Sequence, residues 1–339
     1  MSALEQSIIS ANPPQAISQQ ELHRCTEIIH KIQAYYRERI VGQHWLSLSL
    51  LATFMANGHI LLESVPGLAK TSAAKVLTDA VAGEFSRIQC TPDLLPSDII
   101  GTQIFNYSTN TFETRQGPVF ANFILLDEIN RSSSKTQSAM LEAMQERQVS
   151  IGGVVYRLPD TFVVIATQNP IEQEGTYLLS EAQLDRFLLK EKLTYPTREE
   201  EWEIMNRIER DAFVKAPAVL AINDIQYLQQ ITGKVYMDSS IKRYIVNIIH
   251  ATREPHRFIP PALAQYVTLG ASPRGALAFM AVAKAMALMM GRTWTTPDDV
   301  KLLRHSVLRH RISLSYAAVA SEVPVETIID ALVDAIQSP

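Results

Sequence analysis

The chain has 339 residues, of which 47% are hydrophobic, and its formal net charge at pH 7 is −4. This length predicts two domains and allows a sizeable buried core. The acidic balance disfavours a dedicated nucleic-acid-binding protein, because that class usually carries a basic surplus. The two cysteines, Cys25 and Cys90, are far apart in sequence and provide neither a disulfide framework nor a zinc motif.

The N-terminal sequence lacks the basic start and apolar stretch of a signal peptide. Residues 1–40 have the mixed polarity of a helical segment, with a loop predicted at Asn12-Pro13-Pro14. The most apolar long stretch, Gly275–Met290, is too short for a membrane span and contains Lys284. The sequence therefore predicts a buried helix there, no membrane span and a cytoplasmic protein.

Between residues 41 and 196, short apolar runs alternate with segments of helical periodicity. Nearly continuous Val, Ile, Leu and Phe are typical of strands buried on both faces of a sheet. Strands that alternate with helices predict an α/β domain with a mostly parallel sheet. The five predicted strands are His59–Leu62, Phe85–Cys90, Phe123–Leu126, Phe162–Thr167 and Phe187–Leu193.

Two segments of this region predict β-hairpin insertions instead. In Val149–Leu158, two β-prone runs flank Gly152-Gly153, and tight hairpin turns need residues that tolerate positive φ. A second hairpin is predicted over Thr102–Arg115, with its turn near Ser108-Thr109-Asn110.

The strand pattern fades after Pro196, and residues 197–339 are predicted to form an all-α domain. Ser272-Pro273 and Thr296-Pro297 are typical helix starts, with a hydroxyl N-cap followed by proline. The predicted helices are Thr197–Ala212, Ile222–Thr232, Ser239–Thr252, Ser272–Met290, Thr296–His305 and Val325–Ile336.

The segment Glu63–Ser72, ESVPGLAKTS, follows an apolar strand and precedes a helical pattern, as a phosphate-binding loop does. Lys70 would reach the outer phosphates, and Thr71 would place its hydroxyl on Mg²⁺. Ser64 and Ala69 replace the two glycines of the usual motif, so an ordinary strand–helix turn remains an alternative for the segment alone. The residues predicted to bind the nucleotide here are Ser64, Val65, Pro66, Gly67, Leu68, Ala69, Lys70, Thr71 and Ser72.

Two later strands end in polar residues. FILLDEIN, Phe123–Asn130, places Asp127 where it would orient a Mg²⁺ ion and Glu128 where it would polarise an attacking water. FVVIATQNP, Phe162–Pro170, places Asn169 near a γ-phosphate or the lytic water. An exposed strand end and a turn asparagine are the respective alternatives. Together with the phosphate loop, these segments follow strands whose carboxyl ends bind ligands in open α/β sheets.

Two arginines are candidate phosphate ligands. Arg186 lies in EAQLDRF before the last predicted strand, and Arg274 lies in GASPRGA at a predicted helix start. A helix N-terminus favours anions, so the helix dipole does not account for Arg274, whereas a phosphate partner does. A surface salt bridge is the alternative for either residue, with Asp185 the neighbouring acid of Arg186.

These motifs as a set resemble the MoxR family of AAA+ ATPases, over residues from Val41 to the last helices. The segments that carry the resemblance are VGQ at Val41–Gln43, VPGLAKT at Val65–Thr71, LLPSDIIGTQIFN at Leu94–Asn106, GPVFANFILLDEINR at Gly117–Arg131, ATQNPIEQEGTY at Ala166–Tyr177, EAQLDRF at Glu181–Phe187 and GASPR at Gly270–Arg274.

The resemblance implies a P-loop AAA+ core with hairpin insertions, followed by an all-α lid. It places Gly42 and Gln43 near the adenine of ATP or ADP, and it makes Asn169 the sensor-1 residue. It makes Arg186 the arginine finger and Arg274 the sensor-2 residue. Members of the family are thought to act as chaperones of partner complexes, often of proteins with von Willebrand factor type A domains.

Three functions fit the sequence. The first is a chaperone-like ATPase that hydrolyses ATP with Mg²⁺ in a homo-oligomeric, hexameric ring. The second is a nucleic-acid motor, which the acidic balance and the lack of a basic, aromatic-rich module disfavour. The third is a nucleotide-gated scaffold with little turnover, which the altered phosphate loop permits and the intact Asp127-Glu128 pair opposes.

Overall fold

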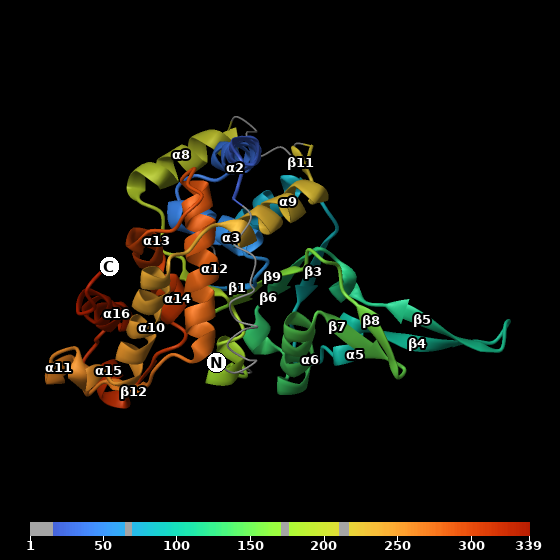
Figure 1. Ribbon diagram of the computed structural model, residues 1–339. Coiled ribbons are helices and arrows are strands. Elements are labelled where there is room, and N and C mark those ends of the chain that lie inside the picture. Colours follow the sequence, from blue (N-terminus) through green and yellow to red (C-terminus); the bar gives the residue numbers. More distant parts are fainter. Residues whose placement is uncertain (1–15, 65–69, 171–175, 210–216) are drawn as a thin grey trace, which may run out of the picture.

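The computed structural model describes residues 16–64, 70–170, 176–209 and 217–339. Its centre is a parallel five-stranded sheet with the strand order β10-β1-β9-β6-β3 (Figure 1). All five predicted strands are present in this sheet. Their bounds are β1 Ile60–Glu63, β3 Phe85–Gln89, β6 Phe123–Asp127, β9 Val163–Gln168 and β10 Leu189–Lys192.

In the central strands β1, β6 and β9, alternate residues enter two separate hydrophobic cores, which explains why these three strands are mostly apolar. Ile60, Leu125 and Ile165 belong to the first core, and Leu61 and Ile124 belong to the second. The helices that contribute to the first core around the sheet are α2 Gln19–Arg39, α3 His44–Met55, α4 Lys70–Asp79 and α9 Ile222–Lys234. The second core is closed by α5 Pro96–Ile100 and α6 Ser134–Glu146.

Both predicted hairpins are confirmed, and they extend together from one side of the molecule (Figure 1). They consist of β4 Gly101–Asn106 with β5 Thr111–Gln116, and of β7 Gln148–Ile151 with β8 Val154–Arg157. Gly152 and Gly153 have φ angles of 58° and 82°, the left-handed values that a two-residue hairpin turn requires. The Thr114 and Tyr156 hydroxyls, 3.0 Å apart, link the two hairpins.

The C-terminal part is mostly helical, as predicted. Its helices are α8 Arg198–Glu209, α9, α10 Ser239–Arg253, α11 Pro261–Ala264, α12 Pro273–Met289, α13 Pro297–Leu302, α14 Arg304–Leu308, α15 Tyr316–Ala320 and α16 Val325–Asp334. The single helix predicted over Thr296–His305 is wrong, because the chain turns at Leu303 and starts α14. Short strands also occur: β11 Leu220–Ala221 pairs with β2 Val81–Ala82, and β12 Val267–Leu269 pairs with β13 Ser313–Leu314.

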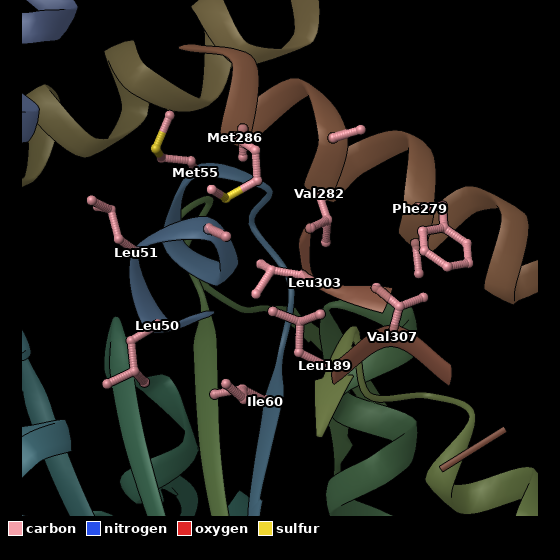
Figure 2. Packing of buried hydrophobic residues seen from close by; sticks show 14 of the residues in the cluster. Leu50, Leu51, Met55, Ile60, Leu189, Phe279, Val282, Met286, Leu303 and Val307 are labelled. Carbon is pink, nitrogen blue, oxygen red and sulfur yellow. The ribbon is translucent and has the colours of Figure 1, made fainter. Parts of the chain in front are cut away.

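The helical part and the sheet share the first core. Figure 2 shows Leu50 and Met55 of α3, Ile60 of β1 and Leu189 of β10 in one cluster with residues of the later helices. Those later residues are Phe279, Val282 and Met286 of α12, Leu303, and Val307 of α14. The lid is therefore anchored to the sheet by apolar packing.

The structure also bears on the predicted buried helix and on the predicted absence of a membrane span. The apolar stretch Gly275–Met290 forms most of α12, which is a largely buried helix that ends at Met289. In the part of the chain that the structure describes, helices long and apolar enough to cross a bilayer are absent. The loop predicted at residues 12–14 and the helix end at residues 210–212 lie outside the described residues.

Candidate functional site

Three adjacent strands end together at the carboxyl edge of the sheet. The pairing register aligns Glu63 of β1 with Gln168 of β9, and Leu126 of β6 with Ala166 of β9. Ser64, Glu128 and Asn169 therefore follow the ends of neighbouring strands, which lie about 4.8 Å apart in a sheet. The structure brings together the polar residues that the sequence analysis placed at strand ends.

Asp127 is a buried carboxylate with partners from both neighbouring strands. Its Oδ1 accepts a hydrogen bond of 2.7 Å from the Thr167 hydroxyl, and its Oδ2 forms a 2.7 Å ion pair with Arg87. The exposed fraction of Asp127 is 7%, so these partners offset the cost of removing its charge from water. The sequence analysis identified Asp127 and missed both partners.

Glu128 has a strained backbone and a side chain at the surface of the site. Its φ of 57° lies in the left-handed region, which residues other than glycine occupy uncommonly. Its amide donates to the Thr167 hydroxyl over 2.9 Å. Its Oε2 accepts from Gln89 over 3.1 Å and from Arg131 over 3.2 Å. The carboxylate is thus held at the edge of the sheet, next to Asp127.

The end of β1 is fixed by a second group of polar contacts. Glu63 Oε2 lies 2.6 Å from both the Lys190 ammonium and the Gln168 amide nitrogen. Burial opposes ionisation of Glu63, but Lys190 and Gln168 outweigh it, so the pKa of this carboxyl lies below its ordinary value. The Ser64 amide donates to the Gln168 carbonyl, and Ser64 is buried.

The predicted phosphate loop is described only at its ends. Residues Val65–Ala69 lie outside the described part, and α4 begins at Lys70. The N-terminus of α4 follows β1 at the carboxyl edge, where free backbone amides and the helix dipole favour an anion. Asn169 is buried close by, and its carbonyl accepts from the Asn130 amide over 3.3 Å.

Gly42 and Gln43 lie beside a separate hollow. Both residues have positive φ angles, 65° and 52°, and Gln43 is the N-cap of α3. A cavity of about 420 Å³ is lined by Gly42 and by residues of α2, α3 and α8, among them Tyr36, Leu48 and Arg207. Its lining combines apolar side chains with a few polar and cationic ones, a composition typical of sites for small organic ligands.

Arg186 and Arg274 lie at the opposite, amino edge of the sheet. Both line a groove of about 320 Å³ with Gly58 and His59, which precede β1. Arg186 Nη1 donates to the Leu141 carbonyl and Arg274 Nη2 to the Gln145 side chain, each over 3.0 Å. Asp185, the acid considered as a surface partner of Arg186, is salt-bridged to Arg311.

The four residues of β1 alone separate the two edges by about 13 Å, at ~3.3 Å per residue. The structure therefore groups Asp127, Glu128 and Asn169 at one edge, and Arg186 with Arg274 at the other.

Comparisons with known proteins identify the family of the two parts of the chain. Residues 59–189 match the model of the ATPase family associated with various cellular activities (AAA), and residues 262–332 match the AAA lid domain. The chain is 44% identical over 319 residues to Chaperone MoxR1 of Mycobacterium tuberculosis, covering 94% of this chain and 83% of that protein. It is 29% identical to Protein MoxR of Paracoccus denitrificans, over 87% of this chain and 91% of the relative.

The fold has a close counterpart among solved structures. The crystal structure of a protein from Cytophaga hutchinsonii superposes with a TM-score of 0.88 at 42% identity, covering 95% of this chain and 98% of that one. The strand order, the helical lid and the aligned relatives lead to the same assignment: the chain belongs to the MoxR family of AAA+ ATPases.

Proposed function

We propose that this chain binds ATP with Mg²⁺ and hydrolyses it at the interfaces of a homo-oligomeric ring, most simply a hexamer. One observation carries the proposal: the carboxylates and Asn169 lie at one edge of the sheet, and Arg186 and Arg274 lie at the other. One chain cannot bring both sets to a single phosphate. A second copy, presenting its amino edge to the carboxyl edge of the first, completes the site.

The carboxyl edge suits a nucleotide and its metal. Lys70 and Thr71 are the first residues of α4, and Asp127 is the last residue of β6. The hydroxyl oxygen of Thr71 and the carboxylate oxygens of Asp127 are hard ligands of the kind that suits Mg²⁺. When bound, Mg²⁺ supplies positive charge that offsets the charge developing on the phosphates. In this proposal Lys70 pairs with the outer phosphates, and Thr71 and Asp127 hold the metal and its water shell.

The remaining roles follow from position. Glu128 takes the proton of the attacking water, and Asn169 orients that water or the γ-phosphate. Gln89 and Arg131 hold the Glu128 carboxylate at the mouth of the site. The cavity beside Gly42 and Gln43 receives the adenine ring.

The use of this ATPase cycle is proposed from the relatives. Chaperone MoxR1 is named as a chaperone, and this chain is proposed to assemble or activate partner protein complexes, among them proteins with von Willebrand factor type A domains. The paired hairpins expose apolar side chains to such clients: Ile104, Tyr107 and Phe112 on one, Val154 and Val155 on the other.

Phosphate release, measured during an ATP titration at several protein concentrations, tests the proposal. We expect Mg²⁺-dependent turnover whose rate per subunit rises as rings assemble. ATP binding without turnover at any concentration would favour the nucleotide-gated scaffold. Turnover per subunit that does not change with concentration, in samples that remain monomeric, would contradict the shared site.

A further inference from the structure

The loop before β10 contains a carboxylate that joins the two candidate phosphate-binding arginines. Asp185 directly precedes Arg186 and caps the C-terminus of α7 Glu181–Leu184. Its Oδ2 accepts a 2.6 Å hydrogen bond from the Ser272 hydroxyl, and its Oδ1 accepts a 2.9 Å hydrogen bond from Arg311 Nε. One side chain of the sheet domain therefore binds two segments of the lid.

Ser272 transmits this contact to Arg274. It is the N-cap of α12, and its hydroxyl oxygen accepts from the Arg274 amide over 3.0 Å. The same hydroxyl thus donates to Asp185 and accepts from the backbone of Arg274. Because Ser272 is fixed by Asp185, the first turn of α12 is fixed relative to the loop that contains Arg186.

Arg311 holds the other side of Asp185. Its guanidinium is almost completely buried, with an exposed fraction of 2%, and it also donates to the Phe187 and Leu188 carbonyls over 2.5 and 3.1 Å. Burial lowers the pKa of Arg311 to about 10, although Asp185 opposes the shift. His310 donates to the Phe187 carbonyl as well. The chain is therefore held by hydrogen bonds on both sides of Arg186, through the Asp185 side chain and through the Phe187 and Leu188 carbonyls.

Both arginine side chains donate hydrogen bonds to the same helix, α6. Arg186 bonds to Leu141 and Arg274 bonds to Gln145, and these acceptors are one turn apart on α6. Their backbones are joined through Asp185 and Ser272, and their side chains are aligned along α6. An isolated structural salt bridge between Asp185 and Arg311 would not require the additional bond to Ser272.

We propose that Asp185, acting through Ser272 and Arg311, is a positioning residue that presents Arg186 and Arg274 as one rigid pair to the neighbouring subunit's nucleotide. The inference rests on the proposed shared site. A 1 Å misplacement of a group that acts on the reacting atoms can cost about 10²-fold in rate. The coupling would also make the angle of the lid a determinant of turnover in the next subunit.

The test uses Ser272→Ala in the full-length ring, because this variant removes the link to α12 and keeps the buried Asp185–Arg311 pair. Asp185→Asn would leave the Arg311 charge buried and unpaired, and it would risk unfolding. We expect kcat to fall about tenfold while the KM for ATP changes less than about twofold. Ser272→Thr keeps the hydroxyl and should restore kcat.

Two controls separate positioning from a lost helix cap. Ser18→Ala removes a comparable serine N-cap, on α2, and should leave kcat within about twofold of the original protein. Ser272→Ala mixed with Lys70→Ala should recover turnover above the mean of the separate preparations, because the Lys70→Ala subunit supplies intact arginines to an intact phosphate loop.

The outcomes distinguish a failure of the positioning role of Asp185 from a failure of the proposed shared site. A kcat for Ser272→Ala equal to that of Ser18→Ala, or no rescue by Ser272→Thr, would overturn the positioning role. The positioning role would also be overturned if the mixture of Ser272→Ala with Lys70→Ala does not recover turnover while the mixture of Arg186→Ala with Lys70→Ala does. If neither mixture recovers in rings that contain both variants, the shared site itself is wrong, and the positioning role falls with it.

Discussion

The two edges of the central sheet differ in charge and in the way their side chains are held. At the carboxyl edge, Asp127 and Glu128 are supported by side chains of the adjacent strands, and Glu128 stays within reach of solvent. At the amino edge, Arg186 and Arg274 are backed by the buried Asp185–Arg311 pair. In the proposed ring, each copy would contribute an acidic, water-activating half to one interface and a rigid, cationic half to another.

At the carboxyl edge, the largest effect on turnover is expected from Glu128. Glu128→Gln keeps the shape of the side chain and its contact with Gln89 but removes the general base, so turnover should fall by ~10²-fold or more while ATP binding is retained. Phosphate release and calorimetry measure the two quantities. Glu27→Gln, at an exposed position of α2, is the matched control and should behave as the original protein does. Near-normal turnover in Glu128→Gln would assign water activation to another residue.

Lys70 should affect ATP binding as well as turnover. Its charge is expected to face the β- and γ-phosphates, so Lys70→Ala should weaken ATP binding by at least about tenfold, or ~1.4 kcal/mol. Calorimetric titration of ATP measures this change, with Lys31→Ala on the exposed side of α2 as the control. Unchanged affinity in Lys70→Ala would remove the phosphate-loop assignment and, with it, the nucleotide from the carboxyl edge.

The smallest effect on turnover is expected at the hairpins, which belong to neither edge. Val154 and Val155 are 51% and 55% exposed on β8. Changing both to threonine should keep the strand and the ATPase rate but lower client affinity about fivefold, the loss of roughly one kcal/mol typical of an interface residue. The corresponding change at exposed Val246 and Val319 is the control.

A client for this measurement can be captured from the native cell with Glu128→Gln as bait, since that variant is expected to hold ATP. Its affinity for each hairpin variant is then measured with purified components. Equal affinities for the hairpin variant and the control would contradict a client role for the 149–158 hairpin.

Most of the fold was predictable from local patterns. The central strands β1, β6 and β9 are mostly apolar because alternate residues enter different cores, and Gly152-Gly153 requires a turn with positive φ. The break at Leu303 was not predictable, because neither glycine nor proline marks it. It places α14 against β10, where Ser306 and Arg309 bond to Glu191 and the Lys190 carbonyl. Such long-range packing has no local sequence signal.

The candidate site was predictable in its strand-end residues and not in their partners. Asp127, Glu128 and Asn169 follow apolar strands directly, so the sequence shows where they are placed. Arg87 and Gln89 occupy alternate, solvent-facing positions of β3, and only the pairing of β3 with β6 brings them to the two carboxylates. The roles assigned to Asn169, Arg186 and Arg274 remain predictions, and those of the two arginines concern a neighbouring copy.

The central claim is that active sites form between copies, and mixing two inactive variants tests it most directly. Arg186→Ala lacks the proposed finger, a group worth ~10³–10⁵ in rate when supplied in trans to small GTPases. Lys70→Ala lacks the phosphate ligand, so each variant alone should be nearly inactive. Mixed rings, verified by co-purification of differently tagged subunits, should recover turnover at interfaces that join an intact loop to an intact finger. Mixed rings that form and stay inactive, or full activity of Arg186→Ala alone, would contradict the account.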